Sequence, residues 1–184
     1  TPRGEDRPPE PAGAIEGAAA VADFLAERAL WHADRCTWLS RTPVGVDEDP
    51  ARAGYRTLDP SVYDGTAGLA VFLAETAAAT GSDEAARTAR GAARQAVATA
   101  GTIPDEQRHG LYSGRLGVAW AVTRVGVLLD EPGLLRAAGD LVATVGDPGE
   151  SEEPDVVSGL AGGILAVLAL HGAIDPGRHL DLAS

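Results

Sequence analysis

Apolar positions recur at helical spacing over most of the chain. From Ala14 to Ala33, Ile15, Val21 and Leu25 fall on one face with acidic residues between them, which predicts an amphipathic helix. Further apolar periods bounded by capping or breaking residues predict helices over Thr66–Thr80, Asp83–Ala100, Arg115–Leu129, Pro132–Val145 and Gly159–His171. The last segment, DPGRHLDLAS, begins another such period. We therefore expect pairs of helices joined by short turns.

Proline and glycine interrupt this pattern between the first two predicted helices. Residues 36–62 contain Pro43, Gly45, Pro50, Gly54 and Pro60, so we predict a loop of roughly 25 residues, longer than compact domains usually hold without a function. Residues 1–13 have no apolar signal-peptide core and are predicted to be a flexible tail. Residues 14–184 then form one structural unit.

The helical pattern is accompanied by an internal repeat. The stretches YDGTAGLAVFL, LYSGRLGVAWA and VVSGLAGGILA align without gaps, with their first aligned glycines 49 and 45 residues apart, about the length of one helical hairpin. Each copy has two glycines three residues apart, at Gly65 and Gly68, Gly114 and Gly117, and Gly159 and Gly162. We expect the preceding Asp or Ser to cap the helix, and the glycines to make room where inner helices converge.

Composition supports helices and excludes several functions. The chain is 45% hydrophobic but only 4% aromatic, which favours an all-α fold of closely packed helices. A net charge of −12 with dispersed arginines argues against nucleic acid or an anionic membrane as partner. Cys36 is the single cysteine, which excludes an internal disulfide, and no apolar run is long enough to span a bilayer. We expect a cytoplasmic protein.

The repeated motifs resemble those of a known family. The series DG-x-x-G-x-A, Y-S-G-x-x-G-x-A-W and D-V-V-S-G-x-A-G is similar to the lanthionine synthetase C-like family, particularly the cyclase domain of two-function lanthipeptide synthetases. The resemblance extends over roughly residues 14–180, including TWL and LDPSVYDG. It implies an α/α toroid of about seven helical hairpins, of which about three lie in this amino-terminal part.

The resemblance also implies a reaction. Family members close thioether rings in ribosomally made peptides (RiPPs): a cysteine thiol of the precursor peptide adds to dehydroalanine or dehydrobutyrine, which come from dehydrated Ser or Thr. Zinc activates that thiol, which fits the general need to deprotonate it. The family's zinc ligands lie in W-C-x-G and C-H-G motifs that this sequence lacks. We therefore predict no metal site and no cofactor within these residues, and zinc only in the complete domain.

Asp155 is the candidate catalytic residue. It opens D-V-V-S-G-x-A-G, and in the family this position is an acidic residue that lines the active site and is proposed to assist acid/base chemistry. The equivalent positions in the other copies are Ser61 and Gly110, so the carboxylate is peculiar to the third copy. Burial at the mouth of an inner helix would raise its pKa. The simpler interpretation is a solvated residue before a helix. The histidine partner implied by the family belongs to the next repeat.

Four further residues are candidates for substrate binding, each beside a plainer interpretation. Asp64 faces the cavity or caps a helix, and His109 lies at the cavity rim or in an exposed loop. Tyr112 and Trp120 contact the peptide or pack in the core. Cys36 is a nucleophile or ligand in principle, but a lone cysteine after an apolar helix is usually a buried small hydrophobe.

Three functions from different classes remain open. The chain is the amino-terminal part of a cyclase and contributes one cavity wall, or it is a non-catalytic module that binds a peptide or a partner without zinc. The third rests on architecture alone, because α/α toroids also house glycosidases and terpenoid cyclases, which would need paired carboxylates. An incomplete ring would also leave the apolar flank of its third inner helix exposed, to be covered by downstream residues, self-association or a partner chain.

Overall fold

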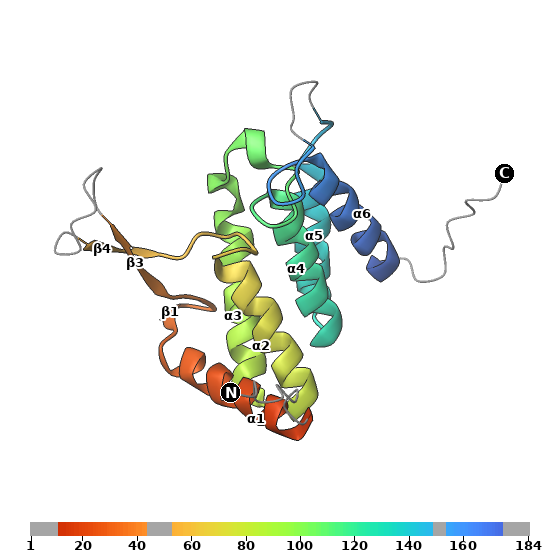
Figure 1. Cartoon of the computed structure of the whole chain (residues 1–184). Coiled ribbons are helices and arrows are strands. Elements are labelled where there is room, and N and C mark those ends of the chain that lie inside the picture. The colour runs from red at the N-terminus through yellow and green to blue at the C-terminus, as the bar shows by residue number, and fades with distance from the viewer. Residues whose placement is uncertain (1–10, 44–52, 149–153, 175–184) are drawn as a thin grey trace, which may run out of the picture.

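The computed structural model describes residues 11–43, 53–148 and 154–174 of the 184-residue chain (Figure 1). The α-helices of these residues are α1 (Pro11–Glu27), α2 (Thr66–Thr80), α3 (Asp83–Thr99), α4 (Arg115–Leu128), α5 (Pro132–Ala143) and α6 (Leu160–Ile174). The strands are β1 (Leu30–His32), β2 (Arg35–Thr37), β3 (Leu39–Pro43) and β4 (Ala53–Thr57), and the 3-10 turns are η2 (Ala100–Thr102) and η3 (Asp105–Gln107). The protein is predominantly helical, as predicted.

The helices form hairpins whose first members lie side by side. α2 packs along α3 and α4 along α5, while α4 also lies between α2 and α6 (Figure 1). α3 contacts both α4 and α5, so α3 and α5 lie behind the row formed by α2, α4 and α6. The expected pairs of helices joined by short turns are confirmed for two hairpins. The predicted partner of α6 lies outside the described residues.

Local signals set the hairpin boundaries within one or two residues of their predicted positions. Gly81 ends α2 in a left-handed conformation, with φ of 74° and its N–H bonded to the Ala77 carbonyl at 2.8 Å. The Ser82 hydroxyl accepts a hydrogen bond from the Ala85 N–H at 3.2 Å and caps α3. Pro132 is the first residue of α5. These caps fix where each helix turns back on its partner.

Small side chains allow the hairpins to pack closely. The buried faces of α2 and α3 are largely alanine, and the larger fully buried side chains that fill the space between hairpins include Leu73, Val118, Val122 and Val125. A second, smaller cluster of Leu116, Val145 and Ala166 joins α4 to α6. On its other side α6 leaves apolar residues exposed, with Ile164 at 62% and Leu168 at 51%. The expected apolar flank on the third inner helix is therefore present.

The amino-terminal region differs from the sequence prediction. The first helix begins at Pro11 and ends at Glu27, rather than running from Ala14 to Ala33, because the chain turns into the β1–β2 hairpin. The Trp38 indole N–H donates to the Leu25 carbonyl at 2.8 Å and fastens the strands to the end of α1. The predicted loop over residues 36–62 was also wrong in part, since it contains most of β2 and all of β3 and β4.

Candidate functional site

Three loops precede α2, α4 and α6 and share one backbone fold. In each loop the N–H of the second motif glycine donates to the carbonyl seven residues earlier. These bonds are Gly68 to Ser61 at 3.4 Å, Gly117 to Gly110 at 3.2 Å, and Gly162 to Asp155 at 3.3 Å. Each loop therefore curls over the first turn of its own helix and supplies a backbone acceptor to an N–H group that lacks a helical partner.

The glycine spacing follows from this curl. A Cβ atom built on Gly68, Gly117 or Gly162 would overlap the carbonyl oxygen of the residue six positions earlier, which is Val62, Leu111 or Val156. The prediction that these glycines make room between converging inner helices was therefore wrong in its main point, because the obstacle is the helix's own loop. At Gly162 a neighbouring loop adds to it, with Leu111 Cβ at 3.0 Å.

Hydrogen bonds join the three loops into a ladder. The N–H groups of Val62 and Tyr63 donate to the Tyr112 carbonyl at 2.9 and 3.0 Å. In the same way the N–H groups of Tyr112 and Ser113 donate to the Val157 carbonyl at 3.0 and 3.2 Å. Segments nearly fifty residues apart in sequence are thus held side by side at one end of the helices (Figure 1).

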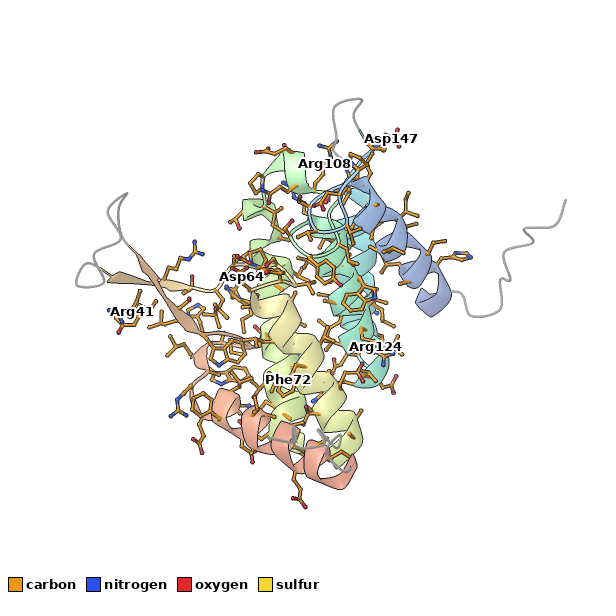
Figure 2. The ribbon with its side chains drawn as sticks, in the orientation of Figure 1. Arg41, Asp64, Phe72, Arg108, Arg124 and Asp147 are labelled. Carbon is orange, nitrogen blue, oxygen red and sulfur yellow. The ribbon has the colours of Figure 1, made fainter. Side chains whose placement is uncertain are left out.

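The ladder forms one wall of a pocket of about 290 Å³. Asp59, Ser61 and Asp64 of the first loop line it together with Ser113 of the second and Val157 of the third. The segment from Thr102 to Gln107 closes the opposite side. Figure 2 shows Asp64 at the end of α2 where these loops gather. This pocket is the place where all three repeated motifs meet.

The chain matches a family model over most of its length. The model for the lanthionine synthetase C-like protein matches residues 56–184, which include all three loops of the ladder. The chain belongs to the lanthionine synthetase C-like family. No curated protein matches the chain. Among the described residues, no helix is both long and apolar enough to cross a membrane.

Asp155, the acidic position implied by the family, is anchored by its own loop. Its Oδ2 accepts hydrogen bonds from the Val157 N–H at 3.1 Å, the Ser158 N–H at 2.7 Å and the Ser158 hydroxyl at 2.8 Å. The backbone and side-chain bonds from Ser158 are the main cause of a lowered pKa for this carboxyl. The expectation of a raised pKa was wrong, because bonds to the charged form outweigh the partial burial.

Asp64 does not cap α2, which corrects one of its two predicted roles. The N-cap residue is Gly65 and no side chain bonds to the helix N-terminus. Instead, Asp64 Oδ1 accepts from the Ser61 hydroxyl at 3.2 Å, and Asp59 Oδ1 accepts from the Ser61 N–H at 2.7 Å. Asp59 was missed in the sequence because it lies before the aligned motif. Its role in the loop is common for aspartate in turns, where the side chain accepts a hydrogen bond from a nearby backbone N–H.

The remaining predicted substrate residues lie in different places. Tyr112 is partly exposed and its carbonyl is a rung of the ladder. His109 is only 6% exposed, so the prediction of an exposed loop histidine was wrong; its Nε2 lies 3.0 Å from the Gly146 carbonyl. Trp120 lines a separate cavity with Arg124, which Figure 2 places far along α4 from the loops. The structure therefore does not bring Trp120 to the loop pocket.

The described residues do not fit a zinc ion. They contain no group of three or more His, Cys, Asp or Glu side chains placed to hold a metal. Cys36 is buried beneath α3, where its thiol lies 3.4 Å from the Thr88 carbonyl. Burial raises the pKa of this thiol to about 12, with Arg87 acting weakly in the opposite direction. A protonated thiol is a poor zinc ligand, and the prediction that Cys36 is a buried hydrophobe is confirmed.

Proposed function

We propose that these residues form one wall of a lanthipeptide cyclase domain whose substrate peptide lies across the loop ends of α2, α4 and α6. The supporting observation is the ladder, because it joins three family motifs at one pocket next to Asp155. In this proposal the two helical layers continue into the α/α toroid that the family resemblance implies.

The reaction is the addition of a peptide cysteine thiol to dehydroalanine or dehydrobutyrine. A bond forms between the sulfur and the β-carbon, the thiol loses its proton, and the α-carbon gains one, so no atom leaves. The site therefore needs a proton acceptor and a proton donor at different moments. It must also hold two distant parts of one peptide together, for which a wall of neighbouring loops is suited.

Asp155 serves this reaction best as a fixed anion. Its lowered pKa keeps the carboxylate ionised at neutral pH, so it has no proton to donate to the enolate. As the only base for a free thiol, whose pKa is about 8.5, it would work against an equilibrium of more than about 10⁴. Its role is to accept a hydrogen bond from a neighbouring donor. An imidazolium is the natural candidate, since the family resemblance implies a histidine partner in the next repeat.

Zinc does not enter the part of the reaction assigned to these residues. The described side chains offer no ligand set for the metal, and the thiol of Cys36 is protonated and enclosed. What this wall contributes is the shape of the loop pocket, the backbone groups of the ladder and the charge of Asp155.

The experiment assays the full wild-type protein and two variants on a dehydrated, cysteine-containing precursor peptide. Ring closure does not change the mass, so unreacted thiols are alkylated and counted by mass spectrometry. Asp155→Asn keeps an acceptor for the Ser158 N–H but removes the charge, and we expect closure to slow about 10²-fold. Ser158→Ala removes only the hydroxyl bond at 2.8 Å and is the matched control, expected to keep most activity.

Two outcomes would contradict the proposal. If Asp155→Asn closes rings at the wild-type rate, the carboxylate serves only the fold of its loop. If the wild-type protein binds the peptide but leaves every thiol open, with zinc supplied, the chain is a peptide-binding module.

A further inference from the structure

An arginine holds the wall of the loop pocket that faces the ladder. Arg115 is the first residue of α4, and its Nη2 donates to the Ile103 carbonyl and to Asp105 Oδ1, both at 2.7 Å. Ile103 is buried in the helical core, whereas the Asp105 side chain is 78% exposed. One guanidinium nitrogen therefore ties the segment from Thr102 to Gln107 to the helix that follows the second loop.

The repeated motif does not itself require this arginine. The aligned copies have Thr66 and Leu160 at the same position. The Thr66 hydroxyl donates to the carbonyl of Asp59 in its own loop at 3.1 Å, and a leucine side chain makes no hydrogen bond. A short hydroxyl or an apolar side chain is thus compatible with the loop fold. The second copy differs by placing at this position a side chain that reaches across to another segment.

Stability alone is a poor explanation for Arg115. Its side chain is only 15% exposed, and its buried Nε has no hydrogen-bond partner within the part of the chain that the structure describes. A buried donor without a partner is destabilising and is uncommon in folded proteins. An ion pair with a carboxylate as exposed as that of Asp105 contributes little in return. What this side chain determines is the position of the Thr102–Gln107 segment.

That segment places a carboxamide with unused hydrogen-bonding capacity at the pocket. Gln107 lines the pocket together with Asp59 and Asp64. Its N–H donates to the Pro104 carbonyl and its own carbonyl accepts from the Gly110 N–H, both at 3.0 Å, so its backbone groups are satisfied. Its side-chain carboxamide has no hydrogen-bond partner among the described residues. A carboxamide offers two N–H donors and one oxygen acceptor, which match the C=O and N–H groups of an extended peptide backbone.

We propose that Gln107 binds the backbone of the substrate peptide in the loop pocket, and that Arg115 is the positioning residue that holds Gln107 at the right distance from the ladder. Arg115 does not touch the peptide. It acts through its bonds to Ile103 and Asp105, which fix the turn that carries Gln107. The identity of the peptide rests on the proposed function, whereas the arrangement of the wall rests on these bonds alone.

The test measures binding of the dehydrated, cysteine-containing precursor peptide, carrying a fluorescent label, to the full protein by fluorescence anisotropy. Gln107→Ala should weaken binding about fivefold through the loss of its hydrogen bonds, and Arg115→Ala about tenfold because the whole segment shifts. The double variant should also bind about tenfold more weakly, since without Arg115 the Gln107 carboxamide no longer reaches the peptide. Independent contributions would instead multiply to about fiftyfold.

Two exposed positions keep the test independent of whether Arg115→Ala folds. Asp105→Ala removes one of the two acceptors of Arg115 and should weaken binding about threefold, but should have no further effect when combined with Gln107→Ala. Glu106→Ala is the matched control, because Glu106 is exposed in the same turn and does not line the pocket. It should leave binding unchanged.

The kinetics of ring closure separate this inference from the proposed function. Gln107→Ala and Arg115→Ala should raise KM and leave kcat within about twofold, whereas general damage to the fold would lower kcat. The inference is overturned if the wild-type protein does not bind the peptide, if Gln107→Ala binds it as tightly as wild type, or if the double variant shows the product of the single effects. Closure with an unchanged KM in Gln107→Ala refutes only this contact. Coupled losses of binding without any closure by the wild-type protein refute only the cyclase assignment.

Discussion

Substituting Gly117 with alanine tests the explanation given for the repeated glycines. The added methyl group would overlap the Leu111 carbonyl oxygen, which is backbone and cannot rotate away. The loop must then withdraw from α4. That movement would break the hydrogen bond from the Gly117 N–H to the Gly110 carbonyl. It would also break the two hydrogen bonds that the Tyr112 carbonyl accepts from N–H groups of the first loop.

The expected loss can be worked out from these contacts. Three hydrogen bonds at about 1 kcal/mol each give roughly 3 kcal/mol, and residual overpacking adds about 1–3 kcal/mol. Alanine returns about 1 kcal/mol through its higher helix propensity. We therefore expect Gly117→Ala to lower the free energy of unfolding by about 3–5 kcal/mol, measured by urea denaturation followed by circular dichroism.

Gly139→Ala is the matched control. Gly139 lies within α5, and a Cβ atom built there meets nothing within 4 Å. The same substitution should stabilise the protein at this position by about 0.5–1 kcal/mol, because only the backbone entropy changes. If Gly117→Ala proved as stable as Gly139→Ala, the loop would not rest on the helix as described, and the account of the motif would be refuted.

Three other predictions concern single side chains. Asp155 has a depressed pKa, so its hydrogen bonds are complete above the ordinary value of 3.8 and are lost as pH falls through the lower pKa of the folded protein. The Ser158 amide resonance in NMR should therefore titrate with a midpoint below pH 3.8, and a midpoint above it would contradict the hydrogen-bond pattern. Iodoacetamide should alkylate Cys36 far more slowly in the native protein than in urea, since the thiol is buried with a pKa of about 12, and equal rates would show that the site is open. Arg124 of α4 donates to the Glu75 carboxylate of α2 at 2.6 Å, but both side chains are almost half exposed. Glu75→Gln should therefore lower the free energy of unfolding in urea by less than about 1 kcal/mol, and a loss of several kcal/mol would indicate a buried ion pair.

The sequence predicted those parts of the fold whose signals are local. Thr66–Thr80 is exact because Gly81 and Ser82 act on adjacent backbone groups. The helical pairing followed from apolar periods separated by capping or breaking residues. The antiparallel pair of β3 and β4 was missed because its strands are short and contain Pro43 and Gly54, which in sequence are equally typical of a loop.

The site was predicted less completely, for a physical reason. The repeat showed that the three loops match. Spacing alone does not reveal whether a side chain at the glycine would clash with its own loop or with another helix. The same limit applies to Asp155, whose position followed from the family resemblance. Its pKa depends on bonds from Val157 and Ser158 whose geometry no pattern of residue types contains.

Asp155 changes the hydrogen bonding of the third loop relative to the second. In the second loop, the N–H groups of Tyr112 and Ser113 reach across to the third loop. The equivalent groups of the third loop, on Val157 and Ser158, are instead taken by the carboxylate of Asp155. The third loop therefore satisfies internally the donors that the second loop uses to hold its neighbour.

At the matching position of the second loop, Gly110, a side chain that bonds its own loop cannot coexist with docking on the third loop. A Cβ atom on Gly110 would lie 2.7 Å from Ser158 Cα, so no carboxylate fits there while the third loop is docked. A loop docked on the third in the same way would meet the carboxylate of Asp155 and compete with it for two N–H groups. At the matching position of the first loop, Ser61 turns its hydroxyl toward Asp64. The three hydrogen bonds that hold Asp155 thus fix both its charge and its position.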